Sequence, residues 1–224
     1  MDSGELRIPF GSGSVTGIVY AGAPSFATML LAHGAGAGQR HPYMTGMAEL
    51  LRARGVSTVT FDFPYTERGD KLPDPADALE ACLVAAFDEV RVRTDAPLFV
   101  AGKSMGGRIA SQCAAKGTIA PTGLVFLGYP LHPPKKPEQR RDRHLPKVRA
   151  PMLFVQGSRD VFGTTEEVAP LVVELAKNAP GSRFFAVDGG DHSHVVPKRS
   201  GVPQEKVYAI IADVIVEWMR PLCL

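Results

Sequence analysis

The sequence predicts an α/β fold: a mostly parallel central sheet of about eight strands, with helices on both faces. Two observations favour this fold class. Short apolar runs alternate along the chain with longer segments whose apolar residues recur at helical spacing. Most of these runs lack polar alternation, which is typical of strands buried on both faces of a parallel sheet. Two short segments around a glycine-rich turn at the N-terminus predict an antiparallel hairpin ahead of this pattern.

The expected strands are recognised by their composition and by the turn residues that bound them. The first two flank Gly11-Ser12-Gly13, which predicts the hairpin turn. The later strands are short runs rich in β-branched, aliphatic and aromatic residues. In chain order, the expected strands are residues 6–10, 15–20, 28–32, 56–61, 98–101, 124–127, 152–156 and 183–187.

The expected helices are recognised by apolar stripes and by end signals. Pro42 stands where the first helix begins, and Gly55 stands where it stops. Residues 62–69 are expected to be a loop. The last helix is expected to turn five apolar side chains inward: Val207, Ile210, Ile211, Val214 and Trp218. In chain order, the expected helices are residues 42–54, 77–93, 108–115, 166–177 and 204–220.

Residues 128–149 differ in composition from the rest of the chain. They contain several prolines and a basic run from Lys135 to Arg143. Because proline lacks a backbone N–H and fixes φ, this density predicts an irregular surface excursion that would serve as a minimal lid. Neither a linker nor an internal repeat interrupts the chain, so residues 1–224 are expected to form a single domain.

Composition argues against several classes of function. A net charge of +2 on 224 residues gives no reason to expect a nucleic acid or an anionic membrane as partner. The N-terminus is polar and acidic, unlike a signal peptide, and no apolar run approaches the ~18 residues of a membrane span. The three cysteines, Cys82, Cys113 and Cys223, lack metal-like spacing. These features predict a cytoplasmic protein without a metal site.

One turn carries a motif of nucleophilic catalysis. The run from Leu98 ends in Gly102-Lys103-Ser104-Met105-Gly106, which fits Gly-x-Ser-x-Gly, and a helix-compatible segment follows. Such a turn exposes the serine hydroxyl, and the flanking glycines leave room where a Cβ would clash. A serine at this boundary is also a good helix N-cap. The motif therefore needs partners elsewhere in the chain before it indicates a nucleophile.

The later strands supply these partners. Ligands of parallel sheets bind outside the carboxyl ends of the strands, and there the chain places Ser104, then Asp160, then His192. A serine hydroxyl is a weak nucleophile, so a histidine must take its proton and a carboxylate must orient that histidine. The alternatives for the acid and the histidine are Asp62, Asp188, Asp191 and His194.

This constellation resembles the α/β-hydrolase superfamily, and in particular its small dienelactone-hydrolase-like and esterase-like members. The resemblance implies an α/β-hydrolase fold with Ser104 as nucleophile, Asp160 in Gly-x-x-Asp as acid and His192 in Asp-His as base. It also implies an oxyanion hole made by the backbone N–H groups of Met105 and Ala35. The expected substrate-binding residues are Gly34, Gly36, Asp62, Tyr65, Lys103 and Tyr129.

The function expected from these residues is cleavage of a carboxylic ester or thioester in a small-molecule acyl substrate, without a cofactor. Dienelactone or carbon–carbon-bond hydrolases and peptidases use the same three groups, and hydrolase-like folds also occur as interaction modules. The glycine-rich loop from His33 to Gly38 has a second interpretation as a phosphate cradle, but it lacks dinucleotide and P-loop spacing. An oxyanion loop is the favoured interpretation.

Overall fold

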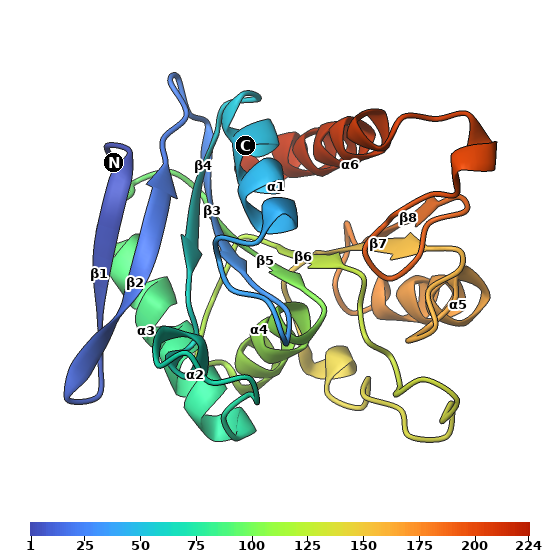
Figure 1. The fold of residues 1–224 in the computed structure, drawn as a ribbon, viewed down its shortest axis with the longest axis horizontal. Coiled ribbons are helices and arrows are strands. Elements are labelled where there is room, and N and C mark those ends of the chain that lie inside the picture. The colour runs from blue at the N-terminus through green and yellow to red at the C-terminus, as the bar shows by residue number, and fades with distance from the viewer.

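Buried apolar runs form one eight-stranded sheet in the computed structural model, which describes residues 1–224 (Figure 1). The order across the sheet is β1-β2-β4-β3-β5-β6-β7-β8. β1 and β2 pair antiparallel, β2 pairs antiparallel with β4, and the remaining pairs are parallel. The strands are β1 (Gly4–Phe10), β2 (Gly13–Tyr20), β3 (Ala27–Ala32), β4 (Val56–Phe61), β5 (Leu98–Lys103), β6 (Leu124–Leu127), β7 (Met152–Gly157) and β8 (Arg183–Val187). The predicted fold class is confirmed.

Helices cover both faces of this sheet, because each buries an apolar stripe against it. Helices α3, α4 and α5 contribute to one hydrophobic cluster, and α1 and α6 contribute to a second cluster on the opposite face (Figure 1). The helices are α1 (Pro42–Arg52), α2 (Pro64–Glu67), α3 (Ala76–Arg91), α4 (Met105–Lys116), α5 (Thr165–Leu175) and α6 (Gln204–Met219). None of them is long and apolar enough to cross a membrane.

Two local expectations differ from the structure. The predicted loop over residues 62–69 contains the short helix α2, which begins at Pro64, where a missing N–H costs nothing. Ile210 on α6 is 41% exposed rather than turned inward, while its neighbour Ile211 is fully buried. The buried face of α6 is therefore rotated away from Ile210 and also includes Ala212, Ile215, Val216 and Met219.

Residues 128–149 form the irregular excursion that their prolines predict, with a single 3₁₀ turn at Leu145–Lys147. Leu131 and Leu145 anchor this excursion in the core, because both are fully buried. The segment between these anchors starts near the carboxyl end of β6 and runs along the side of the sheet that α4 and α5 cover (Figure 1). It adds no further layer of helices over the sheet.

Candidate active site

Ser104 lies in a sharp turn between β5 and α4. Its backbone has φ 50° and ψ −112°, a conformation that non-glycine residues rarely adopt. The glycines of the motif allow this turn. A Cβ on Gly102 would stand 2.1 Å from the nitrogen of Gly107, and one on Gly106 would stand 2.6 Å from the carbonyl oxygen of Ala32. Strand and helix can cross this closely only without those side chains, so the hydroxyl of Ser104 is presented beyond the end of the sheet.

His192 connects Ser104 to Asp160 through two short hydrogen bonds. Its Nδ1 lies 2.7 Å from Asp160 Oδ2, and its Nε2 lies 2.8 Å from Ser104 Oγ. Because a carboxylate only accepts, Nδ1 carries the proton and Nε2 is left to accept from the serine hydroxyl. The three residues follow β5, β7 and β8, as the order along the chain predicts. The structure thus brings together the three residues proposed from the sequence.

Asp160 is fully buried and is held by groups other than His192. The Gln156 side-chain amide donates to Oδ2 at 2.8 Å, and the Phe162 backbone N–H donates to Oδ1 at 2.8 Å. The ring of Phe162 also packs on the imidazole of His192, with 4.3 Å between centroids. Sequence reasoning missed Gln156 and Phe162. The only sequence feature that could have indicated them is position: Gln156 lies near the end of β7, and Phe162 lies two residues after Asp160.

The alternative acid Asp191 and the alternative histidine His194 have other partners. Asp191 Oδ1 accepts the backbone N–H groups of Ser193 and Val195, at 2.8 and 2.9 Å, and so shapes the turn that carries His192. His194 is fully buried and bonds to the Tyr43 hydroxyl and to a strand carbonyl, rather than to Ser104. Burial, followed by the nearby charge of Lys103, lowers the pKa of His194 to about 3. It is therefore a neutral structural residue.

The loop after β3 lies against Ser104 and is held by His33. His33 Nδ1 donates to the carbonyl of Gly34 at 2.8 Å, and its Nε2 accepts the Phe63 N–H at 3.0 Å. Burial lowers the pKa of this imidazole. A Cβ on Gly34 would stand 3.5 Å from the Cβ of Ser104, so the loop backbone passes close to the nucleophile site. Ala35, the next residue, is exposed beside it.

Two clefts flank Ser104, and Ala35, Ser104 and His192 line both of them. The first, here named the lysine cleft, also contains Gly34, Gly36, Ala37, His41, Tyr43, Met44, Lys103 and Ser193. The second, here named the arginine cleft, also contains Pro73, Asp74, Ala76, Leu79, Met105, Arg108, Pro130, Arg141 and Phe162. A substrate bound at Ser104 can therefore extend in two directions.

Lys103 lies in the lysine cleft rather than reaching outward into solvent. It is only 8% exposed, and its amine makes neither a hydrogen bond nor a salt bridge. A Cβ on Gly128 would stand 3.3 Å from Lys103 Nζ and 3.3 Å from His192 Nδ1, which places the amine beside the histidine turn. Burial lowers the pKa of Lys103 to about 8, although the charges of Asp160 and Asp191 act in the opposite direction.

Asp62 and Tyr65, expected to bind substrate, line neither cleft. Asp62 instead accepts two hydrogen bonds from Gln39, at 2.8 Å from the backbone N–H and 3.0 Å from the side chain. Tyr65 is 2% exposed, and its ring packs edge-on against His33 at 5.9 Å. Both residues lie behind the glycine-rich loop and support its shape.

Tyr129, also expected to bind substrate, is fully buried and does not line either cleft. Its backbone N–H donates to Gln156 Oε1 at 2.8 Å, and its hydroxyl donates to the carbonyl of Arg141 at 2.8 Å. It therefore anchors the excursion to β7. A tyrosine directly after a strand end could not be distinguished by sequence from one that faces a ligand.

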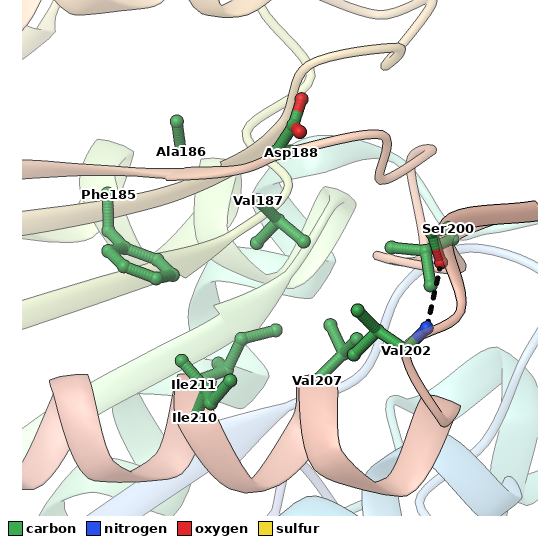
Figure 2. Close-up of a pocket in the computed structure, with 10 residues that line it drawn as sticks. Phe185, Ala186, Val187, Asp188, Ser200, Val202, Val207, Ile210 and Ile211 are labelled. Atoms are coloured by element: carbon green, nitrogen blue, oxygen red, sulfur yellow. Dashed lines mark hydrogen bonds between the residues drawn. The ribbon is translucent and has the colours of Figure 1, made fainter.

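A further hollow lies between β8 and α6, and no residue of the Ser104–His192–Asp160 group lines it (Figure 2). Val207 and Ile211 of α6 face Phe185 and Val187 of β8 across it. Its walls are mostly apolar, and of its two polar side chains the Ser200 hydroxyl accepts from the Val202 backbone N–H at 3.3 Å, while Asp188 makes no hydrogen bond to Ser200. No group of three or more His, Cys, Asp or Glu side chains converges in a way that could hold a metal ion.

The sheet order and the strained serine turn define an α/β hydrolase fold. A family model described as an alpha/beta hydrolase domain matches residues 25–220, so the chain belongs to that family. Similar solved structures include an α/β serine hydrolase without a lid from Xanthomonas campestris, with a TM-score of 0.76 at 18% identity. That match covers 100% of this chain and 96% of the other.

Two further solved structures have the same fold. A dienelactone hydrolase from Anabaena variabilis has a TM-score of 0.73 at 20% identity, covering 98% of this chain and 97% of that one. The esterase domain of a Rhodothermus marinus protein has a TM-score of 0.71 at 15% identity, covering 99% of both chains. At these identities the likeness is one of fold.

Proposed function

We propose that this protein is a serine hydrolase that cleaves carboxylic esters or thioesters through an acyl-enzyme. One observation supports this proposal above all: the unbroken hydrogen-bonded chain from Ser104 Oγ through His192 to the buried Asp160. A histidine with its tautomer fixed on one side and a serine hydroxyl on the other is arranged for general-base catalysis. Family membership and the similarity to esterase structures agree with this chemistry.

The reaction follows from the positions of these groups. Ser104 Oγ attacks the substrate carbonyl while His192 Nε2 takes the hydroxyl proton, and Asp160 stabilises the imidazolium that forms. The imidazolium then gives its proton to the departing alcohol or thiol, which leaves an ester on Ser104. Water, deprotonated by His192, cleaves this ester and restores the free serine.

The tetrahedral intermediates carry an oxyanion that needs hydrogen-bond donors. Met105 is the first residue of α4, so its N–H has no partner within the helix, and we take it as the first donor. Ala35 is the proposed second donor, because it lines both clefts beside Ser104. Each such donor is worth about 3 kcal/mol of transition-state stabilisation in comparable holes.

A fluorophosphonate probe, combined with a panel of 4-nitrophenyl esters and acyl thioesters, tests this function. We expect covalent labelling at Ser104 and turnover of short acyl chains, and the loss of both in Ser104→Ala. Ser193→Ala is the matched control. Like Ser104, Ser193 lines the lysine cleft, but it makes no hydrogen bond to His192. A protein that neither reacts with the probe nor cleaves any ester or thioester would refute the proposal.

A further inference from the structure

Arg108 reaches the arginine cleft from the first turns of α4. Its backbone N–H donates to the carbonyl of Ser104 at 3.1 Å, so its position is fixed relative to the nucleophile site. The residue is partly buried and lines the cleft, yet its guanidinium contacts no carboxylate and no other side-chain acceptor. A guanidinium presents five donors, so this one retains its hydrogen-bonding capacity for a ligand.

Arg141 lines the same cleft and belongs to the excursion rather than to α4. Its backbone is held at both ends: the N–H donates to Leu131 at 2.8 Å, and the carbonyl accepts the Tyr129 hydroxyl at 2.8 Å. Its guanidinium also contacts no carboxylate, whereas the adjacent Arg140 is paired with Asp142. Burial and the charge of Arg108 together lower the pKa of Arg141. The two cations therefore lie near each other without a shared partner.

The carboxylates around the arginine cleft leave a positive surplus there. Asp74 is the one acidic residue that lines it, and its Oδ1 accepts from Arg68 at 2.7 Å. Asp160 is close by but is engaged by His192 and Gln156. Bringing two like charges together out of water is unfavourable unless an anion joins them.

The lysine cleft lacks such a pair of cations. It holds the single amine of Lys103, with no second lysine or arginine in its lining to join it around an anion. Of the two clefts that flank Ser104, the arginine cleft is the one arranged to receive an anion.

We propose that the arginine cleft binds a carboxylate or phosphate group of the substrate through Arg108 and Arg141, so that the enzyme prefers anionic esters. Paired guanidinium groups match the planar, multidentate geometry of these anions better than an amine does. Leu79, Pro130 and Phe162 line the same cleft and suit the short apolar chain that would join the anion to the reacting carbonyl. This inference rests on the proposed hydrolase function of Ser104.

Pairs of esters that differ in one anionic group test the preference directly. The acyl-side pair is mono-4-nitrophenyl glutarate and the 4-nitrophenyl ester of glutaramic acid, which replaces the carboxylate by a neutral amide. The alcohol-side pair is 2-acetoxyethyl phosphate and 2-methoxyethyl acetate. We expect kcat/KM to favour the anion in one pair by about ten-fold or more, and that pair identifies which anion is recognised.

Variants then assign the preference to the two arginines. Arg108→Gln and Arg141→Gln should each lower the anionic-to-neutral ratio of kcat/KM by about ten-fold, and Arg141→Lys should restore part of it. Arg143→Gln is the matched control: Arg143 is an exposed arginine of the same excursion that does not line the cleft, so the ratio should not change. Circular dichroism checks that each variant is folded.

Two results would overturn the inference. One is equal kcat/KM within both pairs, and the other is a preference that survives both glutamine variants but is lost in Lys103→Met.

A binding measurement separates failure of the inference from failure of the hydrolase proposal. Calorimetric titration of Ser104→Ala with glutarate and 2-hydroxyethyl phosphate, compared with Ser104→Ala/Arg141→Gln, needs no turnover. Loss of anion binding with the arginine supports the inference even if no ester is cleaved, and no binding of either anion contradicts it.

Discussion

Asp160 determines which nitrogen of His192 carries the proton, through one hydrogen bond of 2.7 Å to Nδ1. An asparagine would fit the same space but could present its NH₂ group to Nδ1, which favours the wrong tautomer. We expect Asp160→Asn to lower kcat for 4-nitrophenyl acetate by a factor on the order of 10³–10⁴ while the fold is retained. Asp188→Asn is the control, because this exposed acid follows β8 without contacting His192. A loss of less than ten-fold for Asp160→Asn would count against the assignment.

Lys103 is expected to make stability depend on pH. Its pKa is about 8 in the folded protein, against 10.5 as the ordinary value, so the folded state releases this proton first as pH rises. Between these values the unfolded state binds more protons, and the free energy of unfolding therefore increases with pH. Well below pH 8 both states are protonated, and the cost of burying the charge is constant.

Urea unfolding of the wild type and of Lys103→Met measures this effect. The stability of the wild type relative to Lys103→Met should rise by about 2–3 kcal/mol between pH 7 and pH 10, because other groups cancel in the comparison. The exposed Lys71 supplies a control through Lys71→Met, for which no such trend is expected. A difference that does not vary with pH would show that the Lys103 amine is not held in a poorly solvated position.

The sequence predicts the residues whose chemical type and order along the chain the proposed reaction requires. It does not predict residues whose position depends on how side chains pack. Ser104, Asp160 and His192 could be proposed because each follows a strand and each contributes a required group. Tyr129 could not be placed in this way, since a strand end is compatible with either a buried or an exposed ring. Gln156 holds Asp160 through a side chain in the core, and only the folded sheet reveals that contact.

At the scale of elements, the crossing of β5 and α4 depends on the absence of a side chain at Gly102. A Cβ there would lie 2.1 Å from backbone of the helix, which cannot move aside as a flexible side chain could. We expect Gly102→Ala to destabilise the protein by about 3 kcal/mol or more, or to prevent folding, because strand and helix must separate. The measurement is the denaturation midpoint in urea.

Gly46 offers a matched comparison within a helix. It is exposed on α1, and a Cβ at that position would meet nothing within 4 Å. Gly46→Ala should therefore stabilise the protein by about 0.5–1 kcal/mol through helix propensity. If Gly102→Ala and Gly46→Ala had similar denaturation midpoints in urea, steric crowding would not explain why glycine stands at position 102 of the Gly-x-Ser-x-Gly motif.

The elements themselves were predictable to differing extents. Long amphipathic segments and short apolar runs gave their positions within a few residues, because periodicity reports burial directly. The helix α2 was missed, since four residues are too few to show a period. The sequence predicts Ile210 inward because α6 is apolar on more than one side, and helical spacing alone does not reveal which of these sides faces the sheet.

At the scale of the whole molecule, the continuous sheet connects both hydrophobic clusters. Trp218 is the single tryptophan of the chain, is 2% exposed, and its indole N–H donates to the carbonyl of Gly181 at 2.8 Å. It reports on the cluster formed with α1 and α6. If residues 1–224 unfold as one unit, the Trp218 fluorescence transition and the far-UV circular dichroism transition in urea should coincide. Two separated transitions would reveal independent folding units.

The order of strands illustrates what sequence alone leaves open at this scale. Alternation of strands and helices predicts a parallel sheet, and that prediction is confirmed. It does not reveal that β4 lies between β2 and β3. Which strands become neighbours depends on how the helical connections pack on the two faces of the sheet. The antiparallel hairpin reaches the rest of the sheet only through β4.

The excursion has a consequence for how such a protein could be re-engineered. Its two ends are fixed by the buried Leu131 and Leu145, while residues 134–140 between them are exposed. Ser104, Asp160 and His192 all lie outside this segment, so its length and sequence can be exchanged as a cassette without rebuilding the reactive group. Libraries confined to residues 134–143 would then vary the surroundings of Arg141 and leave the proposed nucleophile, base and acid unaltered.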